Sequence, residues 1–186
     1  MRLTSIGFLL SAAVAACGVI PADNTARMPL NQFGGPVLNQ NQAIGLSSWA
    51  LKNPATTRGN PELAARAIAA EDWLAGQDML AGNFGSYQPV NEVPWGELRR
   101  EVRGAIGVAP GAPSQVVVDR LLAASEALHA GDKAGAEAQL QSPVFSLGAD
   151  GTLAALANLP PFPDRELAYA DLGFNENREE GCGLHC

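Results

Sequence analysis

The 186-residue sequence contains few of the side chains that most often carry chemistry. It holds two histidines and three cysteines, so the usual general base and the usual soft metal ligand are both scarce. The motifs HExxH, GxSxG, CxxC and CxxCH are missing, and so is a glycine-rich phosphate loop. These absences exclude the enzyme and haem-protein classes that such motifs define, and we expect no enzymatic activity and no cofactor.

Basic residues are also few. Lys and Arg number 12 against 19 Asp and Glu, and the formal net charge is −7. Nucleic acids and anionic lipid surfaces bind clustered Lys and Arg. The charge balance therefore argues against nucleic acid as a partner.

No hydrophobic run is long enough to span a bilayer. The apolar run Ile6–Ala16 is about a third shorter than the roughly 17 residues that a spanning helix needs. Arg2 is the only charged residue before Asp23. A positive end, a short apolar core and small residues at its exit are typical of a secretory signal peptide, which we place at residues 1–16.

The end of this segment, Val14-Ala15-Ala16-Cys17, resembles the lipobox of bacterial lipoproteins. The resemblance implies cleavage before Cys17, a diacylglycerol on its thiol and an acyl chain, such as palmitate, on its amino group. Gly18 is not the aspartate that often signals inner-membrane retention in this class, so the resemblance implies an outer-membrane anchor facing the periplasm. The alternatives are an ordinary signal peptide followed by a chance cysteine, and a buried N-terminal helix.

With Cys17 modified, two cysteines remain near the end of the chain. In an oxidising compartment, an even pair favours a disulfide between Cys182 and Cys186. His185 lies between them, and two thiolates with an imidazole also suit Cu(I) or Zn(II). A disulfide or an inert tail, a metal site at Cys182, His185 and Cys186, and an intermolecular bridge therefore all stay open.

The chain divides into a tether, a helical domain and a tail. Residues 17–43 have no hydrophobic period and several Pro and Gly, which predicts a flexible, lipid-anchored tether. Residues 44–173 form the predicted domain, and residues 174–186 the Cys- and His-containing tail. Caps and periodicity predict helices at 44–52, 60–82, 94–106, 114–141 (an αα-hairpin), 152–159 and 164–172.

No segment combines strand alternation with turn residues on both sides, so we predict an all-α bundle of five or six helices. Asn60, Ser114 and Asp132 are the expected N-caps within it, and Asp150 is expected to cap the helix at 152–159. A set of apolar residues in the 94–106 helix recurs along one face: Trp95, Leu98, Val102 and Ile106. Its arginines lie on the other side: Arg99, Arg100 and Arg103.

Other residues that could carry chemistry have structural explanations. Glu71, Asp72 and Asp78 are near neighbours that point in different directions from one helix, which predicts a solvated face rather than a pair of catalytic acids. The tryptophans, which could stack on a ligand, are predicted to lie in the core: Trp49, Trp73 and Trp95. His129 ends a predicted helix, where a partial positive charge favours the dipole.

Taken together, these features predict a membrane-anchored lipoprotein of the cell envelope. Its helical domain is expected to act as a non-enzymatic interaction or structural module, with another envelope protein as partner. The alternative is a lipoprotein that handles copper or zinc through the C-terminal Cys and His residues.

Overall fold

The computed structural model describes residues 25–29, 38–81 and 92–162. These residues form seven helices, α1 (Leu38–Lys52), α2 (Pro54–Thr57), α3 (Pro61–Ala81), α4 (Glu92–Ala105), α5 (Ser114–His129), α6 (Lys133–Leu140) and α7 (Gly148–Leu156). Among the described residues, the only β-type pairing is an isolated bridge between Val108 and Phe145. The predicted all-α fold is confirmed, and the four-residue α2 is the helix that the sequence did not indicate.

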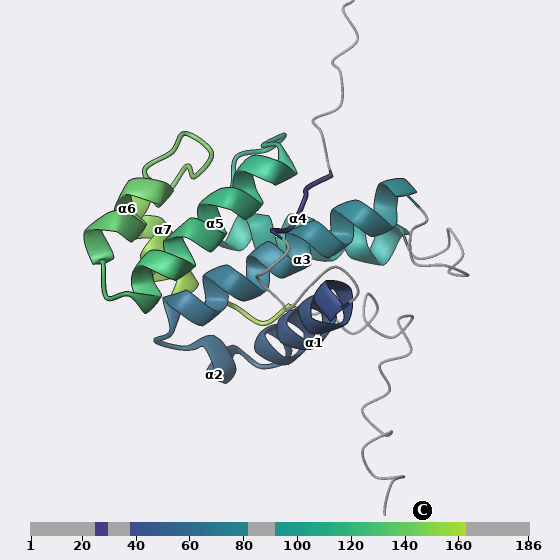
Figure 1. Ribbon diagram of the computed structural model, residues 1–186, viewed down its shortest axis with the longest axis horizontal. Helices are drawn as coiled ribbons and strands as arrows, with labels where there is room; N and C mark the ends of the chain where they lie inside the picture. The colour runs from purple at the N-terminus through teal and green to yellow at the C-terminus, as the bar shows by residue number, and fades with distance from the viewer. Residues whose placement is uncertain (1–24, 30–37, 82–91, 163–186) are drawn as a thin grey trace, which may run out of the picture.

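The central helix is α3, which contacts α1, α2, α4, α5 and α7 (Figure 1). Most of its length is buried on every side, which is the pattern of a helix that runs through a core rather than over it. Small side chains make this possible, because they let several helices approach the same backbone. The fully buried alanines of α3 are Ala64, Ala65, Ala67, Ala69, Ala70 and Ala75.

The apolar face predicted for α4 is confirmed. Three of its members lie in α4 and the fourth, Ile106, directly follows the helix. All are at most 1% exposed: Trp95, Leu98, Val102 and Ile106. The αα-hairpin is confirmed as α5 and α6 packed together. Two predicted caps are confirmed as well, because Asn60 Oδ1 accepts from Leu63 N at 3.0 Å and Asp132 Oδ1 accepts from Gly135 N at 2.8 Å.

Two predicted caps are wrong. Pro113 takes the N-cap position of α5, and Ser114 is the first helical residue. Its hydroxyl accepts a hydrogen bond from Arg103 instead of capping the helix. The helix α7 begins at Gly148, so Asp150 lies inside its first turn, and the N-cap Leu147 makes no side-chain hydrogen bond.

A short extended segment, residues 25–29, packs on the helices. Ala26 and Met28 are buried in the core, whereas Arg27 between them is exposed. This alternation is that of an extended chain lying on a surface. Gln115 holds the segment from α5: its Oε1 accepts from Arg27 N at 2.7 Å, and its Nε2 donates to Arg27 O at 3.1 Å.

The tether predicted for residues 17–43 therefore differs from what the described residues show. Residues 25–29 belong to the packed domain, and α1 begins at Leu38 rather than near residue 44. Hydrophobic periodicity does not predict that residues 25–29 pack on the helices, because Ala26 and Met28 are only two apolar side chains in a five-residue stretch. The last predicted helix, at 164–172, lies outside the described residues.

The loop between α4 and α5 is fixed by a second loop, residues 142–147. Ala109 N donates to Val144 O at 2.7 Å, and Ser146 N donates to Gly107 O at 2.7 Å. Gly107 has a φ of +71°, and a Cβ at this position would overlap the side chain of Leu147. Glycine is therefore required at this turn, both for the backbone angle and for the space.

The docking of residues 25–29 can be tested through Gln115. We expect Gln115→Ala to raise the exchange rate of the Arg27 amide about tenfold, because hydrogen bonds with net contributions of about 0.5–1.5 kcal/mol each are lost. Hydrogen exchange followed by NMR measures this rate. Gln139→Ala is the matched control, since that side chain accepts from Arg120, between α5 and α6. An unchanged Arg27 rate in Gln115→Ala would contradict the docking.

Candidate functional site

Two acidic residues of α3 lie inside the protein. Glu71 and Asp72 are both 0% exposed, so the predicted solvated face is wrong for them. The cause is the central position of α3, whose neighbours cover all of its sides. The side chain of Asp78 lies outside the described part of the chain.

Asp72 pairs with two arginines of α4. Arg103 Nε donates to Asp72 Oδ2 at 2.5 Å, and Arg103 Nη2 donates to Asp72 Oδ1 at 2.9 Å. This is the two-pronged geometry that a guanidinium makes with a carboxylate. Arg99 Nη2 donates to the same Oδ1 at 3.1 Å. The side chains of Arg99 and Arg103, on the polar side of α4, are only 6% and 13% exposed.

Arg103 also reaches the start of α5. Its Nη2 donates to Ser114 Oγ at 2.9 Å, and its Nη1 donates to the carbonyl oxygen of Ala112 at 2.9 Å. One guanidinium thus connects α3, α4 and the loop that leads into α5. Its position is fixed from three directions, which is how a side chain becomes preorganised for binding.

Glu71 lies next to this cluster without a hydrogen bond. Neither of its carboxylate oxygens has a partner. Burial raises the pKa of Glu71 well above its usual value, and the neighbouring Asp72 charge raises it further, while Arg99 and Arg103 oppose the shift. Burial also lowers the pKa of Arg99, although Asp72 favours its charged form.

The charges of the cluster do not cancel when Glu71 is protonated. Two guanidinium groups, on Arg99 and Arg103, then face one carboxylate, on Asp72. The result is one positive charge in excess. Arg99 Nε is buried and has no hydrogen-bond acceptor.

A groove with a volume of about 460 Å³ lies directly over the two arginines. One side is a face of α4, where the space beside Gly104 is open. The other side is the loop after α4, which supplies an apolar wall. The lining residues are Gly96, Arg99, Arg100, Arg103 and Gly104 of α4, and Val108, Ala109, Pro110 and Gly111 of the loop.

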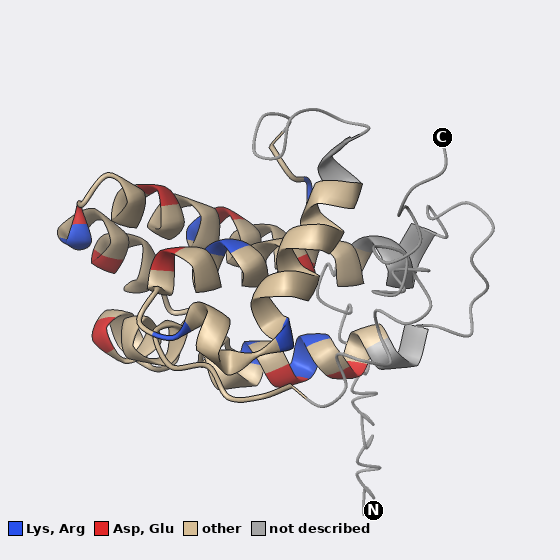
Figure 2. Cartoon of the chain, turned by 90° about the horizontal axis from the view of Figure 1, so that it is seen from below, with Lys and Arg blue, Asp and Glu red and all other residues tan. Residues whose placement is uncertain are grey.

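The rim of the groove is formed by Arg100, whose side chain is 73% exposed. It pairs with Glu97, one turn earlier on α4. Exposed pairs of this kind contribute little free energy. In the described part of the chain, basic and acidic residues are mixed along the helices (Figure 2). Three of the nine residues that line the groove are arginines and none is acidic, so the groove differs from this mixed surface.

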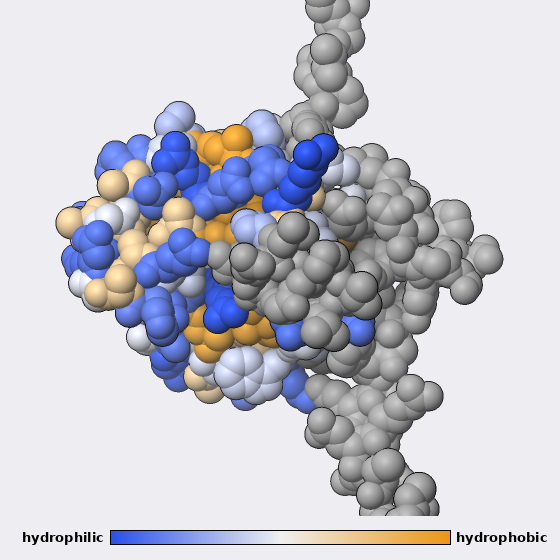
Figure 3. All heavy atoms as spheres, in the orientation of Figure 1, coloured by the Kyte–Doolittle hydropathy of each residue, from blue (hydrophilic) through white to orange (hydrophobic). Residues whose placement is uncertain are grey.

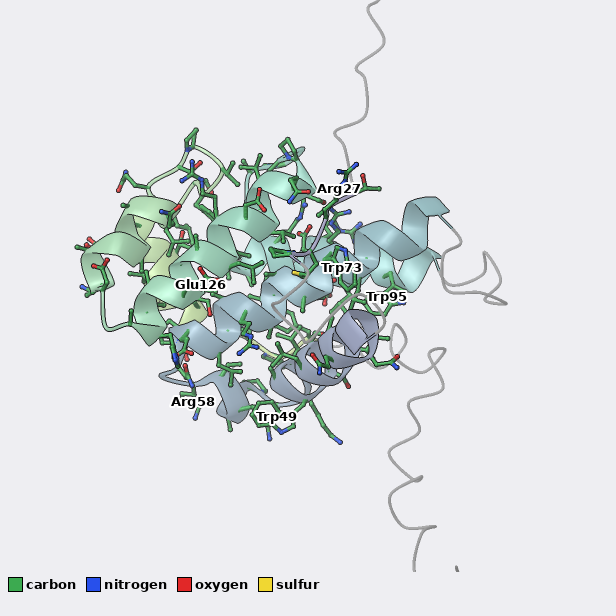
Figure 4. All side chains as sticks on the ribbon, in the orientation of Figure 1. Arg27, Trp49, Arg58, Trp73, Trp95 and Glu126 are labelled. Carbon is green, nitrogen blue, oxygen red and sulfur yellow. The ribbon has the colours of Figure 1, made fainter. Side chains whose placement is uncertain are left out.

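The three tryptophans have different surroundings. Trp95 is 1% exposed in the core, and Trp73 packs against the core while partly exposed. Trp49 is 58% exposed on α1 and points away from the helices (Figure 4), so its predicted core position is wrong. On the face shown in Figure 3, hydrophilic residues divide the hydrophobic surface into patches.

His129 lies at the end of α5, as predicted. Its Nδ1 is 3.0 Å from Glu62 Oε1, at the beginning of α3. Its side chain is 80% exposed, so the contact is a surface pair between two helix ends.

The other predicted sites fall outside the described residues: the signal peptide at 1–16, Cys17, and Cys182, His185 and Cys186. Within residues 25–29, 38–81 and 92–162, no group of three or more His, Cys, Asp or Glu could hold a metal ion. None of the helices in these ranges has the length and hydropathy to cross a membrane. The sequence did not indicate the groove, because its loop wall is held in place by hydrogen bonds to residues 142–147, more than 30 positions further along the chain.

The chain was compared with protein families, curated proteins and solved structures, and none of them matches it.

The unequal roles of the two buried acids can be tested with one apolar substitution each. We expect Asp72→Leu to lower the free energy of unfolding by about 3–5 kcal/mol, because it leaves two buried guanidinium groups without their carboxylate. We expect Glu71→Met to raise it by about 1–3 kcal/mol, because it removes a buried carboxyl group that has no partner. Urea unfolding measures both values. Equal destabilisation by the two variants would contradict this assignment.

Glu71 also predicts a pH dependence. Its pKa in the folded state lies above the ordinary value of 4.5, so the folded state binds more protons than the unfolded state between these two pKa values. The contribution of Glu71 to the free energy of unfolding is therefore largest below about pH 4.5. It decreases as the pH rises, with a slope of up to about 1.4 kcal/mol per pH unit.

Glu71→Gln isolates this effect, because the amide does not titrate. We expect the unfolding free energy of the natural protein, relative to this variant, to decrease as the pH rises from about 4.5 toward the folded-state pKa. Urea unfolding at a series of pH values measures the difference. A difference that does not change with pH would show that Glu71 titrates alike in both states.

Proposed function

We propose that this protein is a bacterial cell-envelope lipoprotein whose helical domain is a non-enzymatic interaction module. The observation that carries the anchor is the sequence Val14-Ala15-Ala16-Cys17, which resembles a lipobox at all of its positions. Cys17 is the residue that would carry the lipid. Gly18 favours sorting to the outer membrane, with the domain in the periplasm.

The geometry of the domain supports binding rather than catalysis. The acids that could form a catalytic pair, Glu71 and Asp72, are fully buried and do not line the groove. The groups that do line it are guanidinium groups and apolar side chains. Guanidinium groups hold their protons at all ordinary pH values and so recognise anions rather than transfer protons.

The position of residues 25–29 sets how far the domain can lie from the lipid. Only residues 18–24 separate Cys17 from the docked segment. At no more than about 3.6 Å per residue, this linker spans at most about 29 Å. An anchor at Cys17 would therefore keep the domain close to the bilayer surface, within reach of membrane proteins rather than of distant soluble ones.

The anchor is tested by Cys17→Ser. We expect the natural protein to incorporate labelled palmitate and to fractionate with the outer membrane. The variant is expected to remain an unacylated precursor. Cys182→Ser is the matched control and should keep the label. Palmitate labelling of Cys17→Ser at the natural level would refute the anchor.

The interaction role is tested separately in the same cells. Crosslinking before detergent extraction should recover the natural protein with a second envelope protein. Recovery of the chain alone under these conditions would contradict an interaction module, whatever the outcome of palmitate labelling.

A further inference from the structure

The groove beside α4 combines a fixed positive charge with an apolar wall. Arg103 is held by Asp72, Ser114 and the Ala112 carbonyl, so its guanidinium needs little reordering when a ligand binds. Arg99, which also lines the groove, is held by Asp72. Both guanidinium groups belong to residues that line the groove, and none of the lining residues is acidic, which makes the groove suited to an anion.

The shape of the groove comes from glycine and from the loop. A Cβ built on Gly104 meets nothing within 4 Å, so the space next to this residue is open. The opposite wall is made of Val108, Ala109 and Pro110. The loop that carries them is held by hydrogen bonds to residues 142–147, so the wall is a fixed surface.

We propose that this groove binds an acidic segment of a partner protein. A Glu or Asp carboxylate of the partner would meet Arg100 and Arg103, and an apolar side chain beside it would lie against Val108 and Pro110. Arg100 can take part because its exposed pair with Glu97 is easily exchanged for another carboxylate. This inference rests on the proposed interaction role and names the chemistry of the partner.

The apolar wall favours a peptide over a phosphate-bearing ligand. The volume of about 460 Å³ falls in the range of pockets that hold a few side chains or a small molecule. An apolar wall adds nothing to the binding of a bare phosphate, whereas it matches an aliphatic side chain next to a carboxylate. The opposite charges of the groove and an acidic segment also speed association and exclude basic competitors.

The test uses the full chain and two blocked peptides. The probe is acetyl-Leu-Glu-Leu-Glu-amide, and its neutral counterpart is acetyl-Leu-Gln-Leu-Gln-amide. We expect the Glu peptide to bind at least about tenfold more tightly, because only it brings carboxylates to preorganised guanidinium groups. Isothermal titration calorimetry measures both affinities, and NMR shift changes should locate the peptide at α4 and residues 108–111.

Variants assign the binding to the groove. Gly104→Leu should fill the open space and abolish binding of the Glu peptide. Gly45→Leu, on α1, is the matched control, because a Cβ at Gly45 also meets nothing within 4 Å, and it should leave binding unchanged. Arg100→Gln should weaken binding about two- to fivefold, the range for an exposed charge pair. Arg58→Gln removes an exposed charge outside the groove and should have no effect. Urea unfolding of each variant verifies that it is folded.

Three results would overturn the proposal. These are equal binding of the Glu and Gln peptides, unchanged binding by folded Gly104→Leu, and binding of inorganic phosphate as tight as that of the Glu peptide, which would indicate a site for free anions. Its failure is distinct from that of the proposed function. If the protein is labelled with palmitate and crosslinks to a partner but does not bind the Glu peptide, only this proposal fails. If it binds the Glu peptide but shows neither labelling nor crosslinking, only the proposed function fails.

Discussion

One carboxylate, that of Asp72, determines how α3 and α4 fit together. It accepts hydrogen bonds from both Arg99 and Arg103, and these three side chains are almost entirely removed from water. Taking such charges out of water costs about as much free energy as their attraction returns. The cluster therefore adds little net stability, but α4 cannot shift along α3 without leaving a buried charge unpaired. The ion pair thus fixes the position of α4, and with it the groove that α4 borders.

Much of the fold follows from local features of the sequence. The apolar spacing of Trp95, Leu98, Val102 and Ile106 is enough to identify α4 and its buried face. Asn60 and Asp132 mark helix starts, because a short polar side chain at those positions satisfies a free backbone N–H group. Such features lie within one or two helical turns, so they can be recognised in the sequence without knowing which helices pack together.

The candidate site could not be predicted in this way. Glu71 and Asp72 follow a run of alanines, and acidic residues on a helix usually face water. Their burial depends on α4, whose Arg99 lies 27 residues from Asp72 in the sequence. From the sequence, Arg99 and Arg103 belong to the polar side of an amphipathic helix, and only the packed structure shows that they reach Asp72 of α3. Trp49 shows the opposite difference: an aromatic residue expected in the core is 58% exposed, on a side of α1 that the described residues leave largely open.

The beginning of α5 connects the docked segment to the groove. Ser114 accepts from Arg103, which lines the groove, and the next residue, Gln115, holds the main chain of Arg27. The loop that ends at α5 carries the apolar wall on one side of the groove. The docked segment, the ion-pair cluster and the groove thus meet at two consecutive residues. If Cys17 carries a lipid, the short linker before Thr25 limits how far the docked segment and the beginning of α5 can lie from the bilayer. The groove would then lie close to the membrane, where an acidic segment of a neighbouring envelope protein could reach it.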